Sequence, residues 1–250
     1  MRIDVAFTVG TARSTQLRDQ LVCVIDVLRA STSITAALAA GALAVWPAAE
    51  ISEAKQLRDQ LAAEGFGVVL AGERHAVPPP GFDLGNSPQD FRAAVVAGKH
   101  VVLTTTNGTR ALVRAAAAGA RRIYVAAFCN ADAMVERLQA DATDDDAGIL
   151  LYAAGSEGRP SLEDTVCAGL LARELSLRVP AVKLSDAARI AMQAYVATAA
   201  DWPQALLKGE HAQNLIAKGF AADVEWSLRI SMATTVGLWQ EGRITTARGL

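Results

Sequence analysis

Two short polar turns hold the residues whose types and spacing best suit chemistry. The first, with Asp26, Arg29, Ser31 and Thr32, directly follows the apolar run LVCVI. The second, residues 105–109 (TTNGT), follows the run VVLT and precedes an alanine-rich stretch. A buried strand that ends in such a turn presents free N–H groups, hydroxyls and the positive end of a helix at one place. Both turns are therefore candidate sites for a phosphate or another small anion.

Each turn also has a purely structural interpretation. The second lacks the spacing of a Walker A loop, and its lone Gly108 does not form a Rossmann fingerprint. Asn107 or Thr109 could cap the helix that follows, with nothing bound there. In the first turn, Asp26 could pair with Arg29, and Ser31 could be the N-cap. However, a carboxylate at the end of a buried strand needs a hydrogen bond, an ion pair or a metal.

A third turn and one long loop contribute further polar groups. The turn follows the apolar run at 149–153 and contains Gly155, Arg159, Glu163 and Asp164. The two carboxylates stand at the head of a predicted helix, where the helix dipole alone explains them, so Asp164 gains interest only as a partner of Asp26. The loop at 72–88 holds four of the eight prolines and excludes a helix. Its metal-type and anion-type side chains are Glu73, Arg74, His75, Asp83 and Asn86.

The elements that must position these turns predict an α/β fold. Near-continuous apolar runs such as Leu21–Leu28 are typical of parallel strands covered on both faces, and helix-like stretches alternate with them. We expect a layered sheet, or sheets, with helices on both faces, an edge strand at Met1–Phe7 and a mostly helical chain after Ser185. No linker divides residues 1–250, so we expect one unit, or two closely associated α/β subdomains.

A weak internal repeat accompanies this pattern. Residues 26–49 align with residues 104–127 without gaps, which places Gly41 on Gly119 and Ser31 on Thr109. Each copy reads strand, polar turn, alanine-rich helix, glycine, strand. A duplicated unit would make the two candidate anion-binding turns structurally related, although alanine bias alone could produce some of the matches.

Composition limits the classes of function. The net charge is −2, from 24 Lys and Arg against 26 Asp and Glu, so bulk charge indicates no nucleic-acid partner. The three cysteines have no metal or disulfide spacing, no apolar stretch suits a membrane span, and the first residues lack the core of a signal peptide. We expect a soluble cytoplasmic protein without a membrane partner. The acidic run of Asp141, Asp144, Asp145 and Asp146 is predicted to be a solvated turn.

Five motifs together resemble one known family. In chain order they are CVIDVLRASTS, AGERHAVPPPGFDLGNSP, VLTTTNGTRAL, AAGSEGRPSLEDTVCAG and AQNLIAKGFAADVEW. Their order and spacing, from about Val22 to Trp226, resemble the 2-phosphosulfolactate phosphatase family, the ComB-like proteins. The resemblance implies a Mg²⁺-dependent enzyme that hydrolyses 2-phospho-3-sulfolactate to sulfolactate and phosphate, a step of coenzyme M biosynthesis. It also implies an α/β architecture and a homodimer.

The resemblance assigns roles to particular residues. It falls on Asp26, Arg29, Ser31, Thr32, Glu73, Arg74, Asn86, Ser87, Thr105, Thr106, Asn107, Gly108, Thr109, Gly155, Glu163 and Asp164. Among these we expect catalytic roles for Asp26, Arg29 and Asp164, and a Mg²⁺ site at Asp26, Glu73 and Asp164, because Mg²⁺ takes few carboxylates together with water and phosphate oxygens. The expected contacts to the anionic substrate come from Ser31, Thr32, Arg74, Asn86, Thr106, Asn107, Gly108, Thr109 and Arg159.

The nucleophile and the substrate stay open at this point. We favour a metal-bound water over an aspartyl-phosphate at Asp26, because the D-x-D signature of haloacid dehalogenase-type phosphatases is absent and Leu28 occupies its second position. Two alternatives to the first function remain. One is a phosphatase of another small acidic phosphoester. The other is a non-catalytic protein that binds phosphate or a nucleotide.

Overall fold

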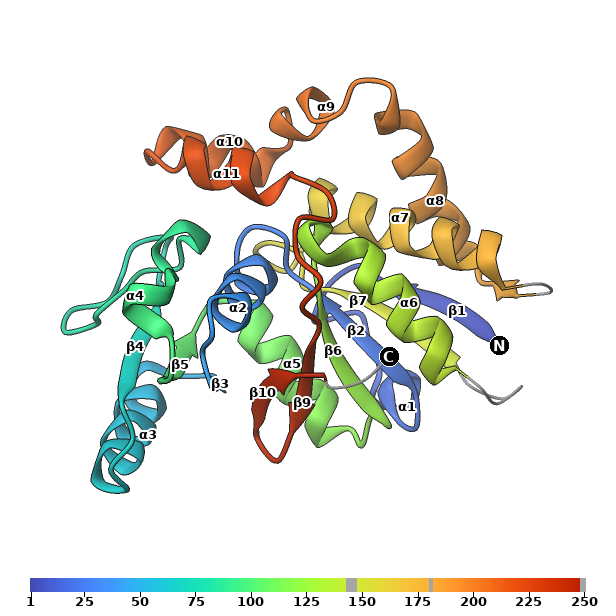
Figure 1. The fold of residues 1–250 in the computed structure, drawn as a ribbon. Coiled ribbons are helices and arrows are strands. Elements are labelled where there is room, and N and C mark those ends of the chain that lie inside the picture. Colours follow the sequence, from blue (N-terminus) through green and yellow to red (C-terminus); the bar gives the residue numbers. More distant parts are fainter. Residues whose placement is uncertain (143–147, 180–181, 248–250) are drawn as a thin grey trace.

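The computed structural model describes residues 1–142, 148–179 and 182–247, which fold into one mixed sheet with helices on its faces (Figure 1). Across these residues the strand order is β4-β5-β3-β10-β9-β6-β2-β7-β1-β8. The strands are β1 (Arg2–Ala6), β2 (Leu21–Ile25), β3 (Ala44–Ala48), β4 (Val68–Gly72), β5 (His100–Thr104), β6 (Arg122–Ala126), β7 (Gly148–Ala153), β8 (Lys183–Leu184), β9 (Gly237–Gln240) and β10 (Arg243–Thr246).

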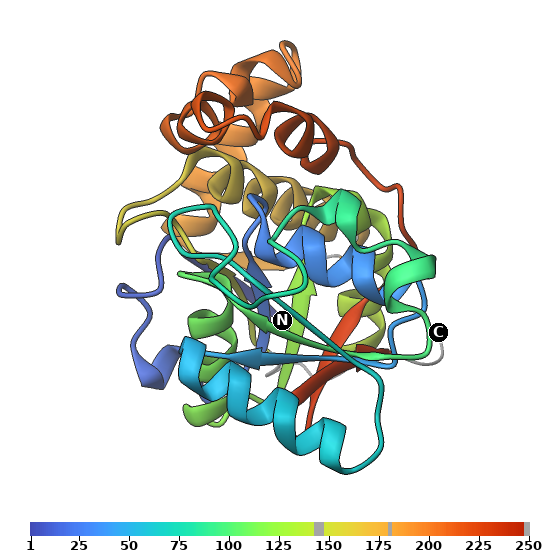
Figure 2. The same ribbon diagram turned by 90° about the vertical axis from the view of Figure 1, so that its left-hand side faces the viewer.

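The sheet consists of two parallel blocks joined by a hairpin. The first block contains β4, β5 and β3, and the second contains β6, β2, β7, β1 and β8. The hairpin β9–β10 pairs antiparallel with β6 on one side and with β3 on the other. The strands of the two blocks cross each other steeply (Figure 2), so that their carboxyl ends turn toward a common region.

Helices cover both blocks and also fill the space between them. The main helices are α2 (Ala30–Ala39), α3 (Ile51–Ala63), α5 (Gly108–Ala117), α6 (Ala131–Asp141), α7 (Leu162–Arg178) and α8 (Asp186–Ala199). One core cluster joins α2 and α5 to the inner faces of both blocks, a second joins the other face of the second block to α6, α7 and α8, and a small third joins α3 to the first block. The layered α/β prediction is confirmed.

Short helices complete the chain. They are α1 (Ser14–Leu17), α4 (Ala93–Val96), α9 (Gln204–Leu207), α10 (Glu210–Ala217) and α11 (Ala221–Ser227), with 3₁₀ turns at Pro88–Asp90 and Phe128–Asn130. Helices α9, α10 and α11 form an arm at one end of the molecule, with α10 and α11 beyond α2 (Figure 1). Among the described residues no helix is long and apolar enough to cross a membrane.

The two predicted repeat segments form the same unit. In the first, β2 leads through α2 to β3, from the second block to the first. In the second, β5 leads through α5 to β6, from the first block back to the second. Because β2 pairs with β6 and β3 with β5, the two units lie side by side and in opposite senses. This arrangement places both helices between the blocks.

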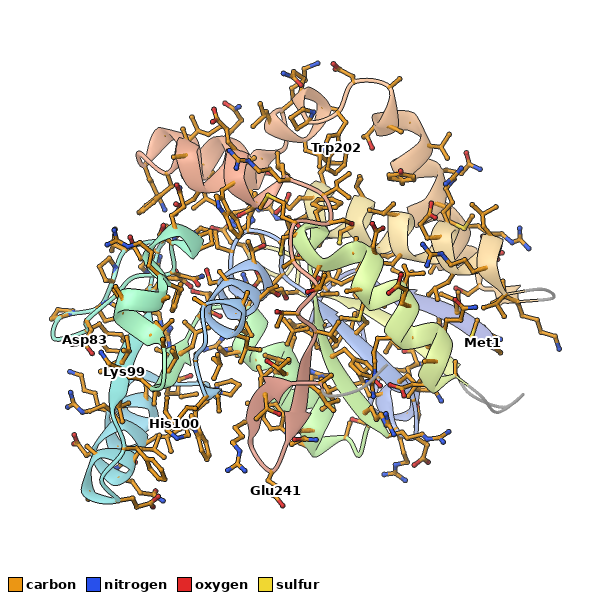
Figure 3. All side chains as sticks on the ribbon, in the orientation of Figure 1. Met1, Asp83, Lys99, His100, Trp202 and Glu241 are labelled. Atoms are coloured by element: carbon orange, nitrogen blue, oxygen red, sulfur yellow. The ribbon has the colours of Figure 1, made fainter. Side chains whose placement is uncertain are left out.

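Three predictions about single elements need correction. The first strand is not at the edge, because β1 lies between β7 and the two-residue β8. The mostly helical C-terminal region ends in the hairpin β9–β10, whose turn residues Glu241 and Gly242 both have positive φ, as a two-residue hairpin turn requires. Glu241 marks its outer tip (Figure 3).

Asp141, the first residue of the acidic run, is also more structured than predicted. Asp141, at the end of α6, forms ion pairs with Arg122 and Arg137 and accepts a hydrogen bond from the Tyr124 hydroxyl. Asp141 is therefore a half-buried anchor for α6 and not part of a solvated turn. Asp144, Asp145 and Asp146 lie outside the described residues.

Candidate active site

A cavity of about 210 Å³ lies where strands of both blocks end near α10. The turns after β2 and β5 form two of its walls, and the turns after β4 and β7 contribute further side chains. Seven of the residues on which the family resemblance falls line it, namely Asp26, Arg29, Glu73, Asn86, Thr105, Thr106 and Asn107. Polar side chains from other segments complete the lining, among them His75, Ser156, Glu157, His211, Asn214 and Lys218. The steep crossing of the blocks is thus what forms the site.

Asp26 occupies the centre of this arrangement. Its Oδ1 accepts a hydrogen bond from the Ala30 N–H at 3.1 Å, at the start of α2. Its Oδ2 faces the start of α5, where a Cβ at position 108 would lie 2.7 Å from this oxygen and 2.6 Å from the Ala30 Cβ. Gly108 is therefore required by the close approach of the two turns, whereas the sequence suggested only an anion-binding role for it.

The N-terminus of α5 can receive an anion. Its N-cap residue, Asn107, makes no side-chain capping bond. In the described part of the chain, no hydrogen bond is made by the N–H groups of Asn107 and Gly108, while the Thr106 N–H donates to Glu73 Oε1 at 2.8 Å. A helix start with open N–H groups and a positive dipole end favours a phosphoryl group.

Glu73 fastens the turn after β4 to the turn after β5. Its Oε1 accepts hydrogen bonds from the N–H and hydroxyl of Thr106, and its Oε2 accepts one from the Ala76 N–H. The carboxylate lies at the cavity wall and is mostly buried. Its oxygens keep lone pairs for a further partner, because a carboxylate has about four acceptor sites.

Arg29 is committed to a buried ion pair. Its Nη1 donates to Asp223 Oδ2 at 2.7 Å, its Nη2 donates to the Ala76 carbonyl at 2.9 Å, and its guanidinium stacks 4.2 Å from the Phe220 ring centroid. Asp223 also accepts a hydrogen bond from Ser87 at 2.7 Å. Arg29 thus borders the cavity, but Asp223 neutralises its charge, and no local pattern indicates this partner, which lies 194 positions away.

Asp164 lies behind the cavity and not on its wall. It is 2% exposed, and its two oxygens accept the N–H groups of Val27 at 2.8 Å and Gly155 at 3.0 Å. It therefore ties the turn after β2 to the turn after β7. Its predicted proximity to Asp26 is present, but its oxygens serve backbone groups and its side chain does not line the cavity.

Three hydroxyls that were predicted to contact phosphate instead form hydrogen bonds to the backbone within the fold. Ser31 accepts the Asp26 N–H and donates to the Val24 carbonyl. Thr32 donates to the Val27 carbonyl at 2.7 Å, and Thr109 bonds back to Thr105. All three side chains are buried and none lines the cavity. They shape the turns, whereas the predicted contact with phosphate stays a prediction.

The predicted arginine and asparagine contacts separate in space. Arg74 turns away, because it bonds to Thr104 Oγ1 and to backbone carbonyls and lies 4.0 Å from Glu50. Asn86 lines the main cavity, and its buried Oδ1 has no hydrogen-bond partner among the described residues. Arg159 lines a neighbouring cavity of about 300 Å³ that shares Ser156, Glu157, His211 and Asn214 with the first.

His211 lines the cavity but was not predicted from the sequence. It stands on α10, and its Nδ1 lies 2.8 Å from Glu163 Oε1 in the first turn of α7. A lone histidine in a helical segment gave no signal by itself, although it lies just before the family-like motif AQNLIAKGF. Lys218, on the same arm, also lines the cavity, and its Nζ donates to the His75 carbonyl.

Burial and neighbouring acidic groups raise the pKa values of Asp26 and Asp164. Burial raises the pKa of Asp26 to about 6; the positive charge of His211 and the Ala30 N–H oppose this rise, and the charges of Glu73 and Glu163 add to it. Burial, followed by the charges of Glu163 and Asp26, raises the pKa of Asp164 well above its usual range. Such clustering of perturbed groups beside a cavity is typical of functional sites.

The predicted metal trio does not assemble. Within the described ranges, no three His, Cys, Asp or Glu side chains are arranged to hold a metal ion. The cavity wall nevertheless carries the carboxylates of Asp26, Glu73 and Glu157, while the charge of Arg29 is already neutralised. The donor set fits a cation bound by Asp26 and Glu73 together with ligand and water oxygens, which is the mode Mg²⁺ prefers.

The fold and the site define the class first: an α/β protein whose strand ends surround a polar cavity. The sequence profile of the 2-phosphosulpholactate phosphatase family matches residues 7–242, so the chain belongs to this family. Similar proteins include the probable 2-phosphosulfolactate phosphatases of Thermotoga petrophila, 39% identical over 85% of this chain and 86% of that protein, and of Carboxydothermus hydrogenoformans, 35% identical over 98% and 96%. The protein of the same description from Pseudothermotoga lettingae is 35% identical over 90% and 92%.

Proposed function

We propose that this protein hydrolyses 2-phospho-3-sulfolactate to 3-sulfolactate and phosphate in a Mg²⁺-dependent reaction. The substrate comes from the description of the family and of its relatives. The observation that carries the chemistry is the Asp26 carboxylate beside the N-terminus of α5 in one cavity lining, where the N–H groups of Asn107 and Gly108 make no hydrogen bond in the described part of the chain. An anion-receiving helix start and an acidic group with a raised pKa together suit phosphoryl transfer better than anion binding alone.

The phosphoryl group would lie at the start of α5. There the N–H groups of Asn107 and Gly108 would donate to its non-bridging oxygens, and Asn86 and Lys218 also line the same cavity. Mg²⁺ bound by Asp26 and Glu73 would supply the charge neutralisation that these carboxylates and a multiply charged substrate require. Water is the proposed nucleophile, because phosphoryl transfer depends mainly on positioning and charge stabilisation.

The substrate's carboxylate and sulfonate would extend into the neighbouring cavity. Arg159 lines that cavity, and no ion pair or hydrogen bond of its side chain is present in the described part of the chain. Arg74, the other predicted partner for these groups, is occupied by Glu50 and Thr104. We therefore assign the acidic end of the substrate to Arg159. This chemistry would place the protein in coenzyme M biosynthesis.

The test is phosphate release from racemic 2-phospho-3-sulfolactate. We expect turnover with Mg²⁺, its loss with EDTA, and a decrease of about 10²-fold or more in Asp26→Asn. Turnover that EDTA leaves unchanged would contradict the metal. Turnover confined to another phosphoester would contradict the substrate, and phosphate binding without turnover of any phosphoester would support a non-catalytic protein.

Two further comparisons sharpen this experiment. Rapid quenching of a turnover with ³²P-labelled substrate should leave no label on the protein, whereas labelled Asp26 would indicate an aspartyl-phosphate. The family resemblance also predicts a cytoplasmic homodimer. Light scattering at working concentration should give twice the chain mass of 26.2 kDa.

A further inference from the structure

The pairing of His211 with Glu163 joins two distant segments inside the protein. Glu163 is 1% exposed, and its Oε1 lies 2.8 Å from the Nδ1 of His211. Its other oxygen, Oε2, is buried and has no hydrogen-bond partner among the described residues. A carboxylate so deeply buried is strongly unfavourable unless it is paired, so the imidazole is its main compensation.

The position of the ring matters as much as the pairing. His211 borders both the cavity that holds Asp26 and the neighbouring cavity that holds Arg159. If the phosphoryl group occupies the first and the acidic end of the substrate the second, the oxygen that joins them lies at their shared wall. Because Nδ1 is engaged by Glu163, Nε2 is the ring atom left to serve that oxygen.

We propose that His211 is the general acid that protonates the leaving oxygen, and that Glu163 is the positioning residue that fixes its tautomer and orientation. The proposal rests on the phosphatase function argued above and adds a residue and a proton path to it. A hydrogen-bonded carboxylate and imidazole that face a reacting atom form a recurrent device for proton transfer.

The surrounding charges favour the protonated ring. Burial acts to lower the pKa of His211, but the hydrogen bond and charge of Glu163, with further help from Asp26 and Asp164, raise it overall. The charged groups at the same cavity walls are Glu157 in the turn after β7, Glu73 after β4, and Arg29 and Lys218. Glu210 precedes the ring on its own helix and lines the second cavity. These interactions therefore favour the protonated ring, which is the form that a general acid requires.

The proton balance is simple. As the bond between phosphorus and the bridging oxygen breaks, that oxygen keeps the electron pair and takes the Nε2 proton of His211. The sulfolactate product therefore leaves with a neutral hydroxyl group. The attacking water forms the new bond to phosphorus and keeps both hydrogens, so the product is dihydrogen phosphate. His211 regains its proton from this product or from solvent.

The leaving group provides the sharpest activity test. An alkyl phosphate has a poor leaving group and needs the acid, whereas 4-nitrophenyl phosphate does not. We expect His211→Gln to slow the sulfolactate ester by about 10²–10³-fold and the nitrophenyl ester by less than about tenfold. Equal losses on both esters would overturn the general-acid role. The matched control is His75→Gln on the exposed rim, which should change both esters in the same proportion.

A second measurement does not depend on turnover. The chain has three histidines, His75, His100 and His211, so their imidazole NMR signals can be assigned with one variant each. In EDTA, the His211 signal should titrate above the ordinary histidine range, and Glu163→Gln should lower its midpoint by about one pH unit or more. If the protein hydrolyses neither ester, the proposed function fails and this titration alone judges the pair. A midpoint unchanged by Glu163→Gln would overturn the positioning role.

Discussion

The turn at residues 26–31, between β2 and α2, and the turn at residues 104–109, between β5 and α5, occupy corresponding places in two similar units. In both, a hydroxyl from the first turn of the helix accepts a backbone N–H from the end of the strand. Ser31 accepts the Asp26 N–H at 3.0 Å, and Thr109 accepts the Thr105 N–H at 3.2 Å. The backbone framework of the two turns is thus alike.

The two turns differ in what they present to the cavity. In the first, the Asp26 carboxylate satisfies the Ala30 N–H, so that turn presents negative charge. In the second, Asn107 makes no side-chain capping bond, and the N–H groups of Asn107 and Gly108 make no hydrogen bond with the described residues, so that turn presents open N–H groups. The turns touch where Gly108 meets Ala30 and Asp26. One backbone unit, used twice with different side chains, therefore presents a carboxylate and a set of open N–H groups to a single cavity.

Removing the charge of the first turn should have the largest effect. Asp26 has its pKa raised from 3.8 to about 6 in the folded protein. The contribution of Asp26 to the free energy of unfolding is therefore fully present below pH 3.8 and is lost as the pH rises through about 6. Asp26→Asn, which does not titrate, should be more stable than the wild type at pH 8 by about 2–3 kcal/mol in EDTA, although its activity with Mg²⁺ should be lower by about 10²-fold or more.

Urea unfolding of both proteins at pH 4 and pH 8 measures this difference. The stability gap should widen as the pH rises between these values. A gap that is the same at both pH values would contradict the raised pKa. Asp132→Asn, at an exposed position in the first turn of α6, is the control and should show no such widening.

Filling the close contact between the two turns with a methyl group should have the next largest effect. A methyl group at position 108 would overlap both Ala30 and Asp26, so Gly108→Ala should destabilise the protein by about 1–3 kcal/mol and separate the two halves of the site. Thermal unfolding and phosphate release would be measured together. Gly10→Ala is the control, because its nearest neighbouring atom would be 3.9 Å away. Equal stability of the two variants would show that the turns can separate freely.

Removing the helix hydroxyl that accepts the strand-end N–H in each turn should have the smallest effect. The loss of stability should be nearly equal for the two turns. Ser31→Ala and Thr109→Val each leave one buried strand-end N–H without a partner, which costs about 1–2 kcal/mol. Chemical denaturation of both variants, with the exposed Thr15→Val as control, measures the costs. A much larger loss in one turn would mean that the two backbone frameworks are not equivalent.

Local patterns predicted the elements of the fold closely. The apolar run at 21–28 became β2, and the stretch after Gly108 became α5. The prediction for the start of α2 was less accurate. The helix begins at Ala30, which places Ser31 inside the helix instead of at its N-cap. The hairpin β9–β10 was missed, although the Glu241–Gly242 pair between two short strands is a local turn signal.

The structure brings some of the predicted site residues together, and it gives others partners that the sequence did not indicate. Asp26, Glu73, Thr106 and Asn107 meet at one cavity, as expected for residues that follow strands in a layered α/β fold. Local patterns could not indicate that Arg29 is neutralised by Asp223 or that Glu163 lies against His211. Both pairs join segments that are remote in sequence, and a periodicity within one segment contains no information about such contacts.

The sequence by itself determined the class of fold, the family and the turns from which the site is built, because apolar runs and glycine-bearing turns act over a few residues. The tertiary structure decided what each polar group of those turns does. The crossing of the two blocks brings Asp26 to the start of α5, and burial then requires every charge to find a partner. Arg29 and Asp164 are thereby committed to the framework, whereas Asp26 and His211 remain at the cavity wall.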